Sequence, residues 1–169
     1  MRFIAGTIVA FVVMTGLARR ASALELGIAN IPASLCNVVN NSSAEVVAGS
    51  LSYTSSATGT ITAYCPVDLN SDWPEHVYIT YQDSTGTSTS SSVAVQLIQM
   101  NLMNGSITSF DTTSSNSFAA TTGSAVQHES NFSNSPGTGQ FAYYIRVDLV
   151  KAVSTDTVIF YGVLLSYDQ

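Results

Sequence analysis

Hydrophobic and polar residues alternate along most of this chain, as they do in strands that are buried on one face. The alternation is clearest in Gly59–Val67, where alternate positions from Ile61 to Cys65 are apolar and the positions between them are Thr or Tyr. Pro66 has no N–H group to donate to a sheet, so we expect the strand to end there.

Further runs with a strand pattern cover much of the remaining chain. They are residues 24–34, 45–53, 58–65, 76–82, 93–100, 141–149 and 156–167, with shorter candidates at 107–110 and 117–120. We expect residues 45–53 to form a hairpin with 58–65, and residues 151–155 to join the last two strands as a second hairpin. Residues 93–100 are apolar on both faces, which is typical of a central strand.

The segments between these runs predict turns and loops. Asn104-Gly105 indicates a tight turn, and residues 121–139 have too little pattern for anything but an exposed loop. No segment beyond residue 23 shows a sustained helical period with caps. About eight closely spaced strands predict an all-β fold, an antiparallel two-sheet sandwich or jelly roll.

The N-terminus has the pattern of an export signal. A basic start precedes an uncharged apolar run at residues 3–18, and Ala21-Ser22-Ala23 has the form of a signal-peptidase site. We expect residues 1–23 to be cleaved, leaving a strand or extension at 24–35 and a sandwich domain at 36–169. An uncleaved membrane anchor is the alternative, for which the run is short. Cleavage would place the protein outside the cell, at the cell surface or in the periplasm.

Loss of the leader makes the chain strongly acidic. Two basic residues, Arg146 and Lys151, remain against eleven acidic ones, a net charge of −9. Without a basic face the chain cannot neutralise a phosphate backbone, so nucleic acid is not an expected partner. Anionic membranes are disfavoured for the same reason, and we expect no membrane partner after signal removal.

The chain has two cysteines, Cys36 and Cys65. In an exported chain the simplest expectation is one disulfide, which would close a loop of about 30 residues and stabilise the fold by roughly 3 to 3.5 kcal/mol. A metal pair is the alternative, but the spacing is long and no His lies near either cysteine. A catalytic thiol would need a positioned base, which the sequence does not indicate.

Residues 24–35 allow two interpretations. Their alternating apolar residues fit a first edge strand of the domain. They also fit an extension that is donated to a neighbouring copy, as in assembly by strand addition. The apolar residues of such an extension are Leu24, Leu26, Ile28 and Ile31.

The loop after residue 67 is the best local site candidate. Oxygen-bearing side chains recur there as in the start of a calcium loop, at Asp68, Asn70, Asp72 and Glu75. The sixth and twelfth positions of the EF-hand pattern are Trp73 and Ile79 instead of Gly and Glu, so a solvated acidic loop is the alternative, and no cofactor is required.

Trp73, the only tryptophan, suggests a second kind of site in the same loop. With Asp72 and Tyr81 it could stack on and hydrogen-bond a sugar ring, or it could cap the end of the core instead. His76 and His128 belong to no metal-spaced motif, and no Gly-x-Ser-x-Gly elbow is present. We therefore predict no catalytic residues and no enzyme activity, with a secreted hydrolase of unrecognised type as the remaining alternative.

The order of the motifs resembles a set of small secreted bacterial proteins of unknown function. The shared plan is a Cys at 36, a Gly-x-Leu-x-polar strand at 49–54, Cys-Pro-Val at 65–67, Val-x-Ile-x-Tyr at 77–81, Tyr-Tyr-Ile-Arg-Val at 143–147 and a final Gly-Val-x-Leu-x-Tyr strand. The resemblance implies an exported β-sandwich and no particular chemistry. More loosely, the chain resembles fimbrial pilins, which have a disulfide-bonded sandwich and an alternating N-terminal extension.

These observations favour a non-enzymatic secreted or cell-surface sandwich with a structural or adhesive role. Its specific form would be a filament subunit that self-associates through residues 24–31. The alternative function is an extracellular carbohydrate-binding module with a glycan as its partner.

Overall fold

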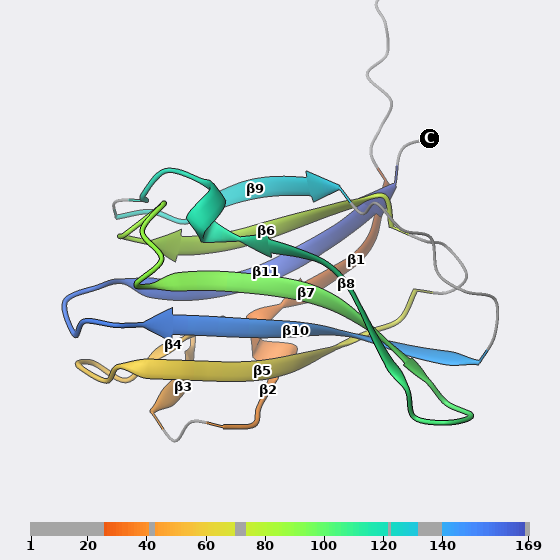
Figure 1. The fold of residues 1–169 in the computed structure, drawn as a ribbon. Coiled ribbons are helices and arrows are strands. Elements are labelled where there is room, and N and C mark those ends of the chain that lie inside the picture. The colour runs from red at the N-terminus through yellow and green to blue at the C-terminus, as the bar shows by residue number, and fades with distance from the viewer. Residues whose placement is uncertain (1–25, 41–42, 70–73, 122, 132–139, 168–169) are drawn as a thin grey trace, which may run out of the picture.

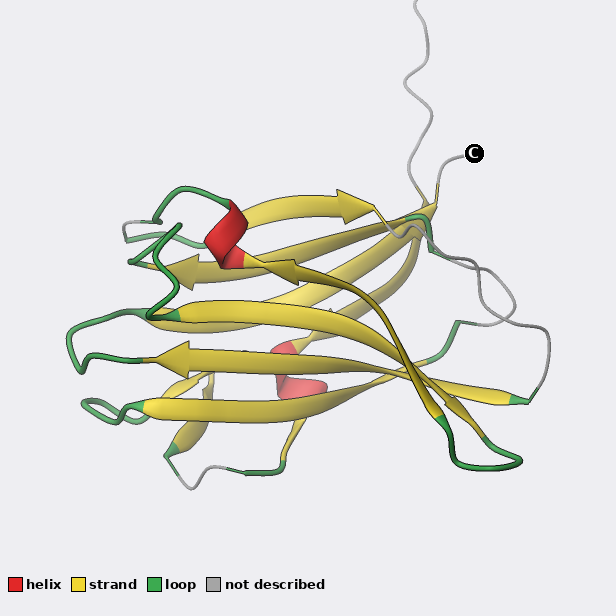
Figure 2. Cartoon of the chain, viewed as in Figure 1, coloured by secondary structure: helices red, strands yellow, loops and turns green. Residues whose placement is uncertain are grey.

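The computed structural model describes residues 26–40, 43–69, 74–121, 123–131 and 140–167. Their secondary structure is almost entirely strand, with two short 3-10 helices, η1 (Ala33–Leu35) and η2 (Ser115–Ser117), as Figure 2 shows. Within this part of the chain no helix is long and apolar enough to cross a membrane.

The strands form two antiparallel sheets that pack face to face (Figure 1). Sheet A has the order β3 (Ala44–Val47), β4 (Ser50–Tyr53), β11 (Val158–Tyr167), β6 (His76–Asp83) and β9 (Val126–Asn131), and β1 (Leu26–Pro32) also pairs with β11. Sheet B has the order β2 (Asn37–Val38), β5 (Gly59–Val67), β10 (Phe141–Lys151), β7 (Ser92–Asn101) and β8 (Ile107–Ser114). This confirms the predicted all-β sandwich.

The core lies between the sheets and follows the alternation of the sequence. From Ile61 to Cys65 on β5 and from Ile145 to Leu149 on β10, every second residue is fully buried, and the positions between them face outward. The fully buried residues include Ile61, Ala63, Cys65, Ile145, Val147 and Leu149 from sheet B, and Ile79, Tyr81, Phe160 and Leu165 from sheet A.

The predicted disulfide is confirmed between Cys36 and Cys65. Cys65 is fully buried on the inward face of β5, and Cys36 follows η1 and is half-buried. The bridge therefore ties the start of sheet B, including the two-residue strand β2, to a central part of the core.

Two predicted hairpins are wrong because strands that follow each other in sequence enter different sheets. Residues 45–53 form two strands, β3 and β4, joined by a turn at Ala48 and Gly49 with positive φ values of 50° and 85°. β4 then lies in sheet A and β5 in sheet B. Residues 152–157 likewise cross from β10 in sheet B to β11 in sheet A.

Other boundaries also differ from the prediction. The segment 121–139 contains the strand β9, which pairs with β6, and residues 117–120 are not a strand because η2 ends at Ser117.

The predicted central strand and the predicted tight turn are confirmed. β7 lies inside sheet B between β10 and β8, and a turn containing Gly105 connects β7 to β8.

β1 and the β3–β4 hairpin share one edge of β11. Ile159 and Phe160 pair with β4, and from Gly162 onward β11 pairs with β1 instead. A bulge between Phe160 and Gly162 marks the change of partner. Gly162 is required there, because a Cβ atom at this position would lie 2.7 Å from the carbonyl oxygen of Ile31.

Candidate ligand-binding face of sheet B

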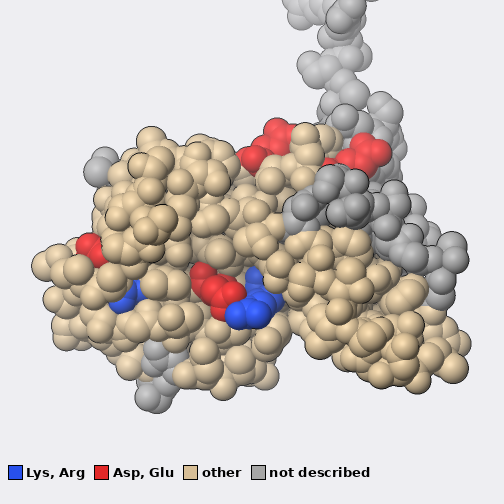
Figure 3. Space-filling view, viewed as in Figure 1, with Lys and Arg blue, Asp and Glu red and all other residues tan. Residues whose placement is uncertain are grey.

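The outward face of sheet B carries a row of polar and aromatic side chains across four strands. The strand register places Tyr64 of β5 opposite Arg146 of β10, Arg146 opposite Gln96 of β7, and Gln96 opposite Thr112 of β8. Because side chains of paired residues lie on the same face of a sheet, these four form one continuous line. The face is turned toward the viewer in Figures 1 and 3.

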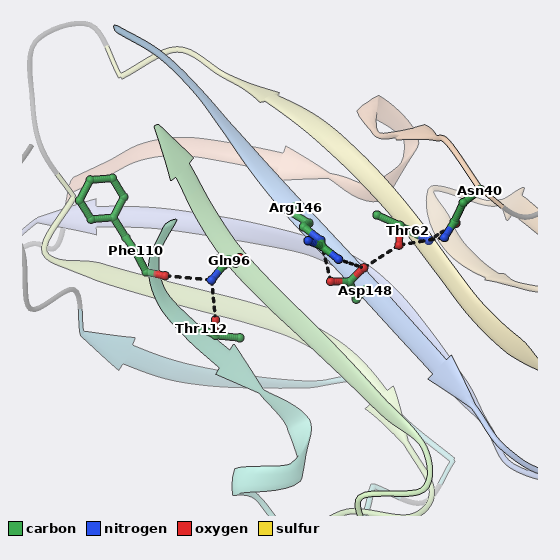
Figure 4. A network of polar contacts seen from close by, with 7 residues as sticks. All are labelled: Asn40, Thr62, Gln96, Phe110, Thr112, Arg146 and Asp148. Atoms are coloured by element: carbon green, nitrogen blue, oxygen red, sulfur yellow. Dashed lines mark hydrogen bonds and ion pairs between the residues drawn. The ribbon is translucent and has the colours of Figure 1, made fainter. Parts of the chain in front are cut away.

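Arg146 and Asp148 form an ion pair at the centre of this face (Figure 4). The Nε atom of Arg146 lies 2.8 Å from Oδ2 of Asp148, and Nη2 donates to Oδ1 at 3.2 Å. The side chains are two residues apart on β10, so both point outward. The carboxylate of Asp148 raises the pKa of Arg146 by hydrogen bonding and by its charge.

A hydrogen-bonded chain extends this pair toward β2. The hydroxyl of Thr62 donates to Oδ1 of Asp148 at 2.7 Å, and Nδ2 of Asn40 donates to the Thr62 hydroxyl at 3.1 Å. Oδ1 of Asn40 accepts from the backbone N–H of Thr62 at 2.6 Å. These bonds fix the carboxylate, and through it the guanidinium, in one orientation (Figure 4).

On β7 and β8, Gln96 is also held in place. Its Nε2 donates to the hydroxyl of Thr112 at 2.9 Å and to the carbonyl oxygen of Phe110 at 3.3 Å (Figure 4). Both amide donors are therefore used, and no described residue donates to its Oε1. This leaves Oε1 of Gln96 as an acceptor on the residue that pairs with Arg146.

Two tyrosines give the face an apolar part. The rings of Tyr64 and Tyr144 meet edge to face with centroids 5.3 Å apart. Burial is the main cause that raises the pKa of Tyr144. Opposite Tyr144 lies Ile98, which is only 3% exposed although it is on the outward side of β7.

The remaining surface around this row is almost uncharged. Figure 3 shows one group of opposite charges near the middle of the face, surrounded by other residues. The charges of Arg146 and Asp148 cancel, so the row offers hydrogen-bonding groups and aromatic rings with no net charge of its own.

Only part of the site predicted around the 68–75 loop lies in the described residues. Tyr81 is fully buried in the core, because it is on the inward face of β6, so its predicted role in stacking on a ligand is wrong. Asp68 and Glu75 are exposed, and Asn70, Asp72 and Trp73 lie outside the described residues. The described residues contain no group of three or more His, Cys, Asp or Glu side chains that could hold a metal.

The two histidines lie on sheet A. Nδ1 of His76 is 2.8 Å from a carboxylate oxygen of Glu129. The ring of His128 stacks on Phe118, with centroids 3.9 Å apart, and is tilted against Tyr81 at 5.7 Å. His128 therefore serves to pack β9 against the residues that follow η2.

The N-terminal strand lies in its own chain's sheet. From Leu26 to Pro32 it pairs with β11, and Ile31 belongs to the core, as a first strand should. Leu24 lies outside the described residues, and the side chains of Leu26 and Ile28 are not described. Exchange of this strand between copies stays a prediction, which sizing of the mature protein would test.

The fold defines the class of this protein as a disulfide-bonded two-sheet β-sandwich. No protein-family model matches the chain, and no curated protein matches it. A solved structure with some similarity is a carbohydrate-binding module specific for non-crystalline cellulose, at 11% identity and a TM-score of 0.38, with 80% of this chain and 85% of that chain covered. Values this low carry no argument about function.

Sequence reasoning overlooked the residues of the sheet B face. Their signal was present, since Tyr144, Arg146 and Asp148 alternate with the core residues of one strand. The outward side of Gly59–Val67 likewise contains Thr62 and Tyr64. What the sequence could not supply was the adjacency of β5, β10 and β7, which turns these separate positions into one surface.

Proposed function

We propose that the protein is a secreted binding module that recognises an uncharged glycan chain on the outer face of sheet B. The observation that carries this proposal is the in-register row of Tyr64, Arg146, Gln96 and Thr112. Secretion itself rests on the pattern of residues 1–23 and on the disulfide, which suits an oxidising compartment.

The chemistry of the row suits sugar hydroxyls. A sugar ring presents an apolar face of C–H groups and an edge of hydroxyls. Tyr64 and Tyr144 provide aromatic surface for the first, and such rings bury a large area at low entropic cost. Arg146 and Asp148 provide fixed donors and acceptors for the second, and charge-assisted hydrogen bonds are the stronger kind.

Pre-organisation supports the same proposal. Asp148 is held by Thr62 and Arg146, and Gln96 is held by Thr112, so these groups lose little rotamer freedom when a ligand binds. A row that runs across the strands also gives an extended ligand several successive contacts instead of one deep pocket.

Affinity electrophoresis of the mature protein in gels that contain soluble neutral polysaccharides tests the proposal. Mixed-linkage glucan, xylan, mannan and carboxymethyl cellulose would cover different sugars and one charged polymer. We expect retardation by at least one neutral polymer. Tyr64→Ala should weaken it more than tenfold, since loss of a central aromatic contact typically costs about 2 kcal/mol or more.

Tyr78→Ala is the matched control. Tyr78 is also half-buried but lies on β6, on the outward face of sheet A. The control should leave the retardation unchanged. The proposal fails if no neutral polymer retards the protein, or if Tyr78→Ala abolishes binding and Tyr64→Ala does not.

A further inference from the structure

A polar pocket lies at the end of the sandwich where β10 ends. Its volume is about 370 Å³, and its lining includes Glu45, Tyr53, Ser55, Lys151 and Asp156. Its lining comes from β3, β4, the end of β10, the connection to β11 and the start of β11, so the pocket is separate from the row on the outward face of sheet B. Small-molecule sites of proteins begin at about this size.

Lys151 is the unusual member of this lining. It is the only lysine of the chain, and it is only 6% exposed. It continues the row of inward-facing residues on β10 after Val147 and Leu149, so its side chain closes the core instead of pointing to solvent. Lysines are almost never buried to this extent unless they are paired.

The Lys151 ammonium has no anionic partner among the described residues. Its Nζ donates to the carbonyl oxygen of Ser55 at 3.1 Å and lies 5.7 Å from the centroid of the Tyr53 ring. These contacts use one of three N–H groups and neutralise none of the charge. A buried charge without a partner is costly, because the low dielectric around it replaces water.

The carboxylates of the pocket have other partners. Oδ2 of Asp156 accepts from the Ser91 hydroxyl at 2.5 Å, and Oε1 of Glu45 lies 3.5 Å from the Ser52 hydroxyl. Neither forms an ion pair with Lys151. The pocket therefore combines one unpaired cation with two acceptors that can take hydrogen bonds from a ligand.

We infer that this pocket binds a small carboxylate that also carries hydroxyl or amino groups. The ligand carboxylate would pair with the Lys151 ammonium, and its hydroxyl or amino groups would donate toward Glu45 and Asp156. The two carboxylates in the lining repel negative charge, so a ligand with a single carboxylate is favoured over a multiply charged anion. Hydroxy acids and amino acids share the required chemistry.

Calorimetric titration of the mature protein with gluconate, lactate and alanine tests the inference. We expect binding of at least one, and Lys151→Met should weaken it more than tenfold. Glucose, which has the hydroxyls without the carboxylate, should not bind at this site. Binding of gluconate or lactate would indicate a hydroxy acid as the ligand, and binding of alanine would indicate an amino acid. Glu129→Gln, which changes one charge on β9, should bind as the unaltered protein does.

Urea unfolding distinguishes a binding lysine from a structural one. Without ligand, Lys151→Met should unfold at the same or a higher urea concentration, because an unpaired buried charge is removed. The binding carboxylate should raise the midpoint of the unaltered protein and leave that of the variant unchanged. No binding of any carboxylate, binding of glucose that Lys151→Met weakens as much as it weakens carboxylate binding, or a lowered midpoint for unliganded Lys151→Met would each overturn the inference.

Discussion

Removal of the Cys36–Cys65 bridge should destabilise the protein by about 3.5 kcal/mol. The two residues are 29 positions apart. A cross-link that closes a loop of about 30 residues lowers the entropy of the unfolded chain, and at 25 °C this corresponds to about 3.5 kcal/mol of free energy. In a Cys36→Ala/Cys65→Ala variant we expect a further loss of about 1 kcal/mol, since the buried Cys65 sulfur is replaced by a void of roughly methylene size.

Urea unfolding at pH 7 measures both contributions. The comparison uses the oxidised protein, the same protein under reducing conditions and the double variant. Reduction removes the cross-link alone, and the double variant also removes the packing of the sulfur atoms. We expect free energies of unfolding that fall by about 3.5 and then about 1 kcal/mol. If reduction changes the free energy by less than about 1 kcal/mol, the unfolded-chain account of this bridge is refuted.

Two further predictions concern single groups in the core. Gly162→Ala should lower the free energy of unfolding more than Gly105→Ala does. Both glycines have a positive φ, but only a Cβ atom at residue 162 would meet a backbone atom, the Ile31 oxygen at 2.7 Å. Amide exchange of β1 would measure the release of this strand, and equal losses of stability in the two variants would contradict the account. Burial raises the pKa of Tyr53 and of Tyr81 to about 12, above the value of about 10 in an unfolded chain. The unfolded state therefore releases these protons first, so the free energy of unfolding should be unaffected by them below pH 10 and fall between pH 10 and 12. Tyr81→Phe should reduce this loss of stability above pH 10 and leave the free energy of unfolding at pH 7 unchanged, since no described residue bonds the Tyr81 hydroxyl. Tyr53→Phe should lower the free energy of unfolding by about 1 kcal/mol, because the Tyr53 hydroxyl lies 2.6 Å from the Gly59 and Leu149 carbonyl oxygens. A stability curve that is flat up to pH 12 would refute the burial argument.

The class of fold was predictable because alternation is a local property. The alternation alone places Ile61, Ala63 and Cys65 on the inward face of their strand, as the structure has them, and Cys36 and Cys65 have no other cysteine to pair with. The end of the strand is one residue later than expected, because Pro66 is paired within the sheet and β5 runs to Val67. Burial of one face of each strand is sufficient to require a second sheet.

The assignment of strands to sheets was not predictable in the same way. A short connection after Tyr53 or Lys151 is compatible with a hairpin and with a crossing between sheets, and only packing of the whole core decides between them. The strand β9 was missed because Val126–Asn131 contains a single large apolar residue, Val126. Its inward positions are filled instead by His128 and Ser130, which local hydrophobicity does not detect.

The parity of β10 explains why both proposed sites depend on one strand. Residues 145, 147 and 149 are buried between the sheets, so residues 146 and 148 must face outward and residue 151 must face inward. Arg146 therefore meets Asp148 at the solvent-exposed surface, where a carboxylate neutralises it. Lys151 instead reaches the end of the core, where the described residues offer it a carbonyl and an aromatic ring. The positive charge of Arg146 is thus paired within the chain, whereas that of Lys151 is left for a ligand. The difference follows from the even position of the one and the odd position of the other in β10.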